Sequence, residues 1–149
     1  MKFTANDVFL DVDEQSVASF LEFAAKAAKD AGFTDDISEL KRSFLEREKE
    51  FSTGLEDGFA IPHAKTAAVL KPGFLYFRLT QPIDWQTYDD QPVSDIFTLM
   101  VPPENAGDEH LKMLANLSTA LLEDDFKVKL RELTSKKAIA DFINQKIGE

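Results

Sequence analysis

The spacing of hydrophobic residues in the first part of the chain predicts one strand and two helices. The apolar run at residues 8–10 ends at an acidic residue and predicts a strand. Apolar residues then recur at helical spacing, with Asp13 as the expected N-cap and Gly32 as the stop. This stripe consists of Val17, Phe20, Leu21, Ala24, Ala28 and Ala31. A second helix is expected to begin within residues 34–36 and to end near Glu50.

The middle of the chain is rich in strand patterns. A short buried strand is expected at residues 59–61, closed by Pro62. The runs 74–79 and 96–101 are apolar enough to be buried on both faces and are bounded by Pro or Gly, so each predicts a buried strand. Residues 85–92 between them are polar and predict a loop or hairpin.

Helical spacing returns in the last third of the chain. One apolar stripe consists of Leu111, Leu114, Ala115, Leu121 and Leu122, and another of Ile139, Phe142, Ile143 and Ile147. The element order is therefore strand, two helices, three or more strands, then two or three helices. That order indicates a single layered α/β domain with a mixed sheet.

Composition and charge narrow the class of protein. The 149 residues include 44% hydrophobic and 30% charged side chains, which is typical of a globular chain. The net charge of −10 argues against a nucleic-acid partner and is compatible with a basic protein partner. The absence of cysteine excludes disulfides and thiolate chemistry. No apolar run has the length of a signal peptide or membrane span, so we expect a cytoplasmic protein without membrane insertion.

Two histidines and one arginine are the side chains best suited to chemistry. His63 follows Pro62 at the end of a predicted strand, where a stiff backbone presents its ring. His110 lies in the first turn of a predicted helix, near unsatisfied amide donors. Arg47 extends the apolar face of the second helix, and a charge is rarely directed inward without a partner. Each also has a structural interpretation: a turn histidine, a histidine packed at a helix end, and an arginine contacting its helix C-terminus.

The remaining sequence narrows the reaction that these three side chains could perform. No serine lies in a Gly-x-Ser-x-Gly elbow, and no glycine-rich nucleotide loop is present. A metal-dependent hydrolase using the histidines with Asp108 or Glu109 is conceivable, but an arginine beside a cation would be repelled. Phosphoryl transfer through phosphohistidine fits best, because neutral imidazole is nucleophilic and the loose transition state needs positive charge.

Residues 54–64, called here the signature segment, read Gly-Leu-Glu-Asp-Gly-Phe-Ala-Ile-Pro-His-Ala. Arg47-Glu48 precede the segment and Glu109-His110-Leu111 follow it. With these residues the sequence resembles the IIA component of the bacterial phosphoenolpyruvate:sugar phosphotransferase system, in its fructose/mannitol class. The likeness extends over nearly the whole chain. It implies one type 2 IIA domain over residues 1–149, with a mixed parallel/antiparallel sheet and helices on both faces.

The resemblance also implies residue roles and partners. His63 would be the phosphorylated nucleophile, and Arg47 and His110 would line the phosphate site. The phosphocarrier protein HPr would be the donor and a IIB component the acceptor, with the membrane IIC component reached only indirectly. Neither a cofactor nor a metal is implied.

Three questions stay open at the level of sequence. Nitrogen-regulatory members of the family share the histidine signature, so a phosphorylation-dependent binding regulator is the alternative to sugar uptake, although residues 92–118 favour the fructose-type members. The transported sugar is not specified, because the IIA domain does not touch it. The acidic residues near the signature segment would either steer a basic partner or only keep the protein soluble. They are Glu46, Glu48, Glu50, Glu56 and Asp57.

Overall fold

A five-stranded sheet lies at the centre of the computed structural model, which describes residues 3–104 and 108–147, without the side chains of residues 108–111. Its strands are β1 (Val8–Val12), β2 (Phe59–Ala60), β3 (His63–Lys65), β4 (Gly73–Ile83) and β5 (Val93–Val101). The order is β1-β4-β5-β2, and β3 also pairs with β5. The β4–β5 pair is antiparallel and the other pairs are parallel, so the sheet is mixed, as expected.

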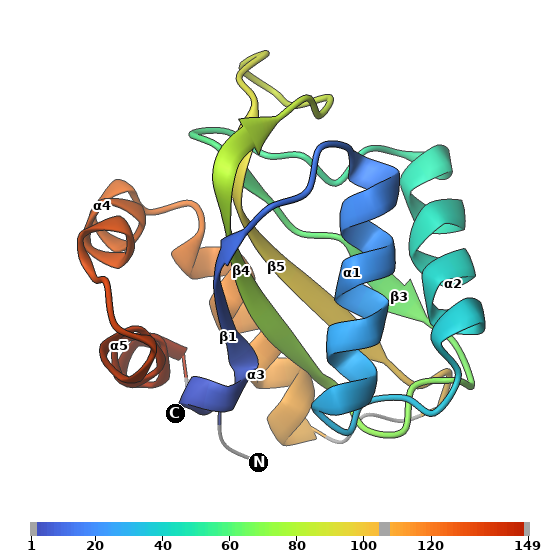
Figure 1. The fold of residues 1–149 in the computed structure, drawn as a ribbon. Coiled ribbons are helices and arrows are strands. Elements are labelled where there is room, and N and C mark those ends of the chain that lie inside the picture. Colours follow the sequence, from blue (N-terminus) through green and yellow to red (C-terminus); the bar gives the residue numbers. More distant parts are fainter. Residues whose placement is uncertain (1–2, 105–107, 148–149) are drawn as a thin grey trace.

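Helices cover both faces of this sheet (Figure 1). On one face lie α1 (Val17–Asp30) and α2 (Ile37–Glu50). On the other lie α3 (Asp108–Ala120), α4 (Asp124–Glu132) and α5 (Lys136–Ile147). A short 3-10 turn, η1 (Ala5–Asp7), precedes β1. The predicted α/β architecture with helices on both faces is confirmed.

Each face of the sheet has its own hydrophobic core, and β4 contributes to both. Leu75 and Phe77 belong to the cluster that includes α1 and α2, whereas Phe74 and Tyr76 belong to the cluster with the C-terminal helices. All four side chains are buried. Successive side chains of a strand point to opposite faces, so the apolar run at residues 74–77 suits the centre of a sheet covered on both sides.

The helix ends differ from the sequence prediction at one position. Asp13 does not cap α1. The N-cap is Ser16, whose hydroxyl accepts a hydrogen bond from the Ser19 backbone N–H at 3.1 Å. The helix ends where expected, with Gly32 at a φ of +87°, a conformation that favours glycine. Asp36, one of the three expected starts, caps α2 by accepting from the Glu39 N–H at 3.1 Å.

The strand β3 is the element that the hydrophobic pattern did not predict. His63 was expected to leave the end of a strand, but it begins β3 and lies opposite Leu99 of β5. The strand is three residues long and follows Pro62, which interrupts the run that starts at β2. Such a short segment carries too little alternation to be recognised.

Candidate active site

His63 is held in place by the sheet on both sides of Pro62. The Pro62 carbonyl accepts a hydrogen bond from the Leu99 backbone N–H at 2.8 Å. After His63, the side chain of Ala64 is buried in the core beneath α1 and α2. Because side chains alternate along a strand, His63 and Lys65 share the opposite side of β3.

The environment of His63 favours a neutral imidazole. The residue is half-buried, and its Nδ1 atom is buried without a hydrogen-bond partner among the described residues. Burial lowers the pKa of His63, and the Arg47 guanidinium lowers it further. The Ile61 backbone and the Glu48 carboxylate oppose this change in pKa but do not reverse it.

A pocket of about 410 Å³ lies beside His63, between residues of α2 and β3. It is lined by Arg42, Ser43, Glu46, Arg47, Glu50, His63 and Lys65. The structure thus brings together His63 and Arg47, which lie 16 positions apart in the sequence. Arg47 is half-buried and donates from Nη1 to the Phe51 carbonyl at 2.7 Å, so it also contacts the C-terminal end of its helix.

The other two cations of the pocket differ in how strongly they are engaged. Arg42 donates to both carboxylate oxygens of Glu39, at 2.8 and 2.6 Å, and lies 3.1 Å from a Glu46 oxygen. Lys65 is exposed and makes no ion pair with any side chain that the structure describes. The sequence pattern did not single out Lys65, because Lys65 and His63 share one side of the backbone only when residues 63–65 form the strand β3.

Glu48 is half-buried and is held by hydrogen bonds to residues outside its own helix. Its Oε2 accepts from the Thr53 backbone N–H at 2.8 Å and from the Trp85 indole N–H at 2.9 Å. Its Oε1 accepts from the Thr53 hydroxyl at 2.7 Å. The carboxylate therefore links the C-terminal end of α2 to Thr53, which directly precedes the signature segment, and to Trp85 in the connection between β4 and β5. Trp85 lies 37 positions away, so no local spacing in the sequence could reveal the contact.

The signature segment folds back on itself before it reaches His63. The Ile61 backbone N–H donates to the Thr53 carbonyl at 3.0 Å, and Gly54 forms an isolated bridge with Ala60. A side chain at Gly54 would collide with the Gln86 carbonyl oxygen. Glycine is therefore required by close backbone approach at this position.

The third sequence-selected residue, His110, lies in the first turn of α3, but its side chain is outside the described residues. The same holds for the Asp108 and Glu109 side chains of the metal-site alternative. Within the described part of the chain, no group of three metal-ligating side chains comes together. No described helix is long and apolar enough to cross a membrane.

The acidic residues near the signature segment do not share one environment. Glu46 and Glu50 line the pocket, whereas Glu48 is engaged by Thr53 and Trp85. Asp57 pairs with Lys127 of α4 at 2.6 Å.

A neutral imidazole beside a guanidinium, in an open pocket, is suited to phosphoryl transfer, because Arg47 can stabilise charge on the transferred oxygens.

Comparison with known proteins identifies the family. The model of the family "Phosphoenolpyruvate-dependent sugar phosphotransferase system, EIIA 2" matches residues 1–146. The chain therefore belongs to this family and is a phosphotransfer component, as the resemblance of the signature segment indicates.

Individual relatives include both sugar-specific and regulatory proteins. The chain is 40% identical over 123 residues to a fructose-specific EIIA component of Haloferax volcanii, covering 83% of this chain and 79% of the relative. It is also 40% identical over 118 residues to a nitrogen regulatory protein of Bradyrhizobium diazoefficiens, covering 79% and 75%. By contrast, it spans only 22% of the length of a fructose-specific EIIABC component of Bacillus subtilis.

Solved structures share the fold. The nitrogen regulatory protein IIA-Ntr of Neisseria meningitidis superposes with a TM-score of 0.78 at 28% identity, covering 93% of this chain and 94% of that one. Mannitol IIA of Escherichia coli has a TM-score of 0.76 at 20% identity, covering 96% and 99%. The same enzyme IIA in complex with phosphorylated mannitol enzyme IIB has a TM-score of 0.71 at 18% identity, covering 99% and 97%.

Proposed function

We propose that His63 accepts a phosphoryl group from phosphorylated HPr and passes it to a sugar-specific IIB component during carbohydrate uptake. The observation that carries this proposal is a neutral histidine sharing a pocket with Arg47 in a chain of the EIIA family. The fructose-specific relative supports the sugar-uptake role. The E. coli complex of mannitol IIA with phosphorylated IIB supports an acceptor of the IIB kind.

The burial of Nδ1 leaves Nε2 as the nitrogen that attacks. A new bond forms between Nε2 and phosphorus while the nitrogen–phosphorus bond of the donor histidine breaks, and the donor ring keeps the electron pair of that bond. Because its pKa is lowered, the His63 ring holds a free electron pair for this attack at neutral pH. Transfer to IIB reverses the roles, with His63 as the leaving group.

Arg47 is proposed to bind the equatorial phosphoryl oxygens, where charge develops in the transition state. Its Nη1 is engaged by the Phe51 carbonyl, so that contact orients the guanidinium. By the resemblance to the family, His110 would complete the phosphate site from α3. No cofactor or metal is required by this reaction. We further propose that residues 1–149 form one type 2 IIA domain and act in the cytoplasm, where phosphoenolpyruvate is available.

Phosphorylation in a purified system tests the proposal. The chain is incubated with phosphoenolpyruvate, enzyme I and HPr, and the product is assayed for acid-labile phosphate. Wild type should gain the label and His63→Ala should not, with circular dichroism confirming that the variant is folded. Full labelling of His63→Ala would overturn the assignment.

The second candidate is a nitrogen-regulatory protein, favoured by the 40% identity to the Bradyrhizobium protein. Both candidates use His63 but differ in the acceptor. Adding IIB components of fructose and mannitol systems to the labelled chain separates them. Rapid loss of label to one IIB supports sugar uptake, whereas retention of label with every IIB supports the regulatory role.

A further inference from the structure

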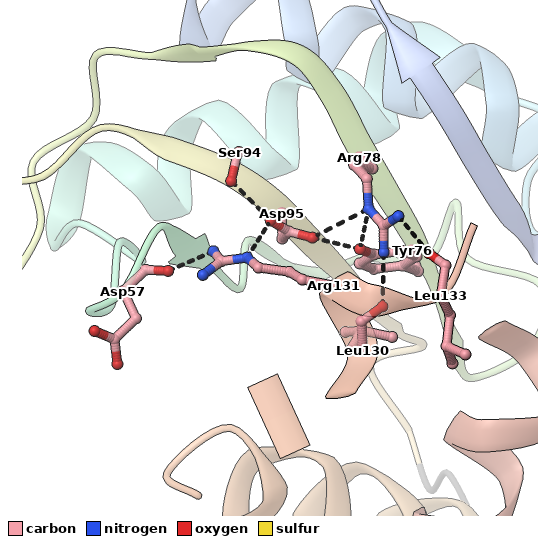
Figure 2. A network of polar contacts seen from close by, with 8 residues as sticks. All are labelled: Asp57, Tyr76, Arg78, Ser94, Asp95, Leu130, Arg131 and Leu133. Atoms are coloured by element: carbon pink, nitrogen blue, oxygen red, sulfur yellow. Dashed lines mark hydrogen bonds and ion pairs between the residues drawn. The ribbon is translucent and has the colours of Figure 1, made fainter. Parts of the chain in front are cut away.

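A buried polar cluster lies behind the signature segment and is centred on Asp95 of β5 (Figure 2). Asp95 is only 1% exposed. Its carboxylate accepts from the Ser94 hydroxyl at 2.7 Å, from Arg131 Nε at 3.0 Å and from the Tyr76 hydroxyl, and Arg78 lies 3.5 Å away. Burial raises the pKa of Tyr76, so its hydroxyl stays protonated and donates. These hydrogen bonds hold the buried carboxylate in one position, and the cluster is called here the Asp95 anchor.

Two side chains of α4 reach the tip of the signature segment, Asp57-Gly58, and one of them, Arg131, also contacts Asp95. Arg131 donates from Nη2 to the Asp57 carbonyl, and its guanidinium lies 4.3 Å from the centre of the Phe59 ring. Lys127 Nζ lies 2.6 Å from the Asp57 carboxylate. Figure 2 shows Arg131 between Asp95 and Asp57.

The Lys127–Asp57 pair is unequal in burial. Lys127 is 4% exposed, whereas the Asp57 side chain is half exposed. A buried ammonium group needs an anionic partner, and the other acid near it, Asp124, is 3.8 Å away and almost fully exposed. Removal of the Asp57 carboxylate would therefore leave the Lys127 ammonium buried without a close anionic partner, which costs more than the loss of a surface ion pair.

The tip itself has a backbone that needs such support. Asp57 has a φ of +60° and Gly58 one of +82°, so two consecutive residues adopt the left-handed conformation. For a residue with a side chain this conformation is costly and persists only where its surroundings hold it. The Gly58 carbonyl also accepts from the backbone N–H groups of Ser94 and Asp95, at 2.8 and 3.0 Å.

The helix that supplies the two cations is fixed to the sheet in turn. Arg78 of β4 donates to the carbonyls of Leu130 and Leu133, at 2.9 and 2.7 Å, at the C-terminal end of α4. The sheet, α4 and the tip therefore form one connected unit, and none of Asp57, Lys127 and Arg131 lines the pocket. From the tip the chain runs through β2 directly to His63.

We propose that Lys127 and Arg131 are positioning residues, which clamp the tip of the signature segment so that His63 is presented correctly to the pocket. This inference rests on the proposed function for its effect on phosphoryl transfer. It also gives Asp57 a role different from that of its neighbour Glu56, whose exposed side chain makes no hydrogen bond or ion pair with a described residue. If the acids of this segment only steered a basic partner, the two would be equivalent.

The experiment compares matched variants at a temperature where all are folded. Asp57→Asn and Lys127→Met each break the Lys127–Asp57 ion pair and leave the Arg131 contact with the Asp57 carbonyl in place. Lys127→Met also removes the buried charge, so it serves as the test variant if Asp57→Asn, which leaves that charge unpaired, does not fold. Glu56→Gln and Lys129→Met are the controls, because each removes the same charge from an exposed neighbouring position. The rate of His63 phosphorylation is measured against the concentration of phosphorylated HPr.

The clamp predicts a split between the two kinetic constants. Asp57→Asn and Lys127→Met should each lower the maximal rate about 10-fold with little change in the half-saturating HPr concentration, because a misplaced nucleophile slows chemistry more than encounter. The double variant should be no slower than either single variant, since both break one contact. The control variants should keep the maximal rate of wild type.

A spectroscopic arm tests the positioning without any phosphoryl transfer. The NMR signals of the His63 ring and the exchange rates of the Gly58 and Phe59 amides should change in Asp57→Asn and Lys127→Met and stay unchanged in the controls. Unchanged signals, or equal rates in Asp57→Asn and Glu56→Gln, would overturn the clamp. A wild-type chain that accepts no phosphate would instead overturn the proposed function, while the NMR arm still decides whether the clamp positions His63.

Discussion

The contacts of Glu48 make it the residue whose removal should most disturb the structure near the pocket. In Glu48→Ala, three donors lose their acceptor: the Thr53 backbone N–H, the Thr53 hydroxyl and the Trp85 indole N–H. Thr53 is 4% exposed and Trp85 9%, so water replaces the lost acceptor poorly. Thr53, which directly precedes the signature segment, would then be held by fewer hydrogen bonds.

The magnitude follows from these three donors. A buried donor left without a partner costs about 1–3 kcal/mol, so three donors at the lower end of that range cost about 3 kcal/mol in free energy of unfolding. For a chain of this size, about 3 kcal/mol corresponds to a decrease in Tm of about 6–12 °C. Glu48→Gln keeps one carbonyl oxygen as an acceptor, so its loss should be smaller.

Urea unfolding followed by circular dichroism measures the effect, with thermal unfolding as a second probe. Glu50→Ala is the matched control, because Glu50 lies on the same helix, is exposed and makes no hydrogen bond with a described residue. We expect the control to stay within about 0.5 kcal/mol of wild type. A Glu48→Ala variant that loses no more stability than Glu50→Ala would refute the reasoning.

Three further predictions concern the pocket and its surroundings. Arg47→Ala should slow phosphoryl transfer about 100-fold both to and from His63, measured in single-turnover labelling, and an unchanged rate would remove Arg47 from the mechanism. The pKa of His63 is lower in the folded chain than in the unfolded chain, where it is about 6.5. The stabilisation due to the neutral ring is therefore fully present above a pH of about 6.5, and it is lost as the pH falls from that value toward the folded-state pKa. Wild type should therefore lose more stability than His63→Gln on acidification, and parallel pH curves from urea unfolding would contradict the burial effect. Gly54→Ala should lose about 2 kcal/mol in the same assay, since its new side chain would collide with the Gln86 carbonyl, and a stability equal to wild type would show that the connection can shift.

The sequence was sufficient to predict the architecture because the long elements have strong periodicity. The strands β4 and β5 contain long apolar runs, and helices α1 and α2 have one-sided stripes. The N-cap of α1 was harder to predict from the sequence. Asp13 and Ser16 are both good N-caps, and the bond between Ser16 and Ser19 decides between them only in the folded chain.

The candidate site was partly accessible to the same reasoning. Arg47 was selected because it extends the apolar face of the second helix, and in the structure it lines one pocket together with His63. Lys65 and Glu48 were missed for different reasons. The position of Lys65 depends on a three-residue strand, and the partners of Glu48 include a residue far away in the sequence. Long-range pairing of this kind leaves no periodic trace.

The position of β3 at the border of the sheet also bears on how the protein avoids associating with itself. In the described part of the chain β3 pairs with β5 alone, so its outer backbone groups face away from the sheet. Exposed strand edges invite pairing with a second copy, and proteins counter this with short strands, prolines and lysines. Here Pro62 precedes the strand and offers no N–H, the strand has only three residues, and Lys65 ends it. The short β3 edge, preceded by Pro62 and ended by Lys65, is therefore a poor template for pairing with a second copy.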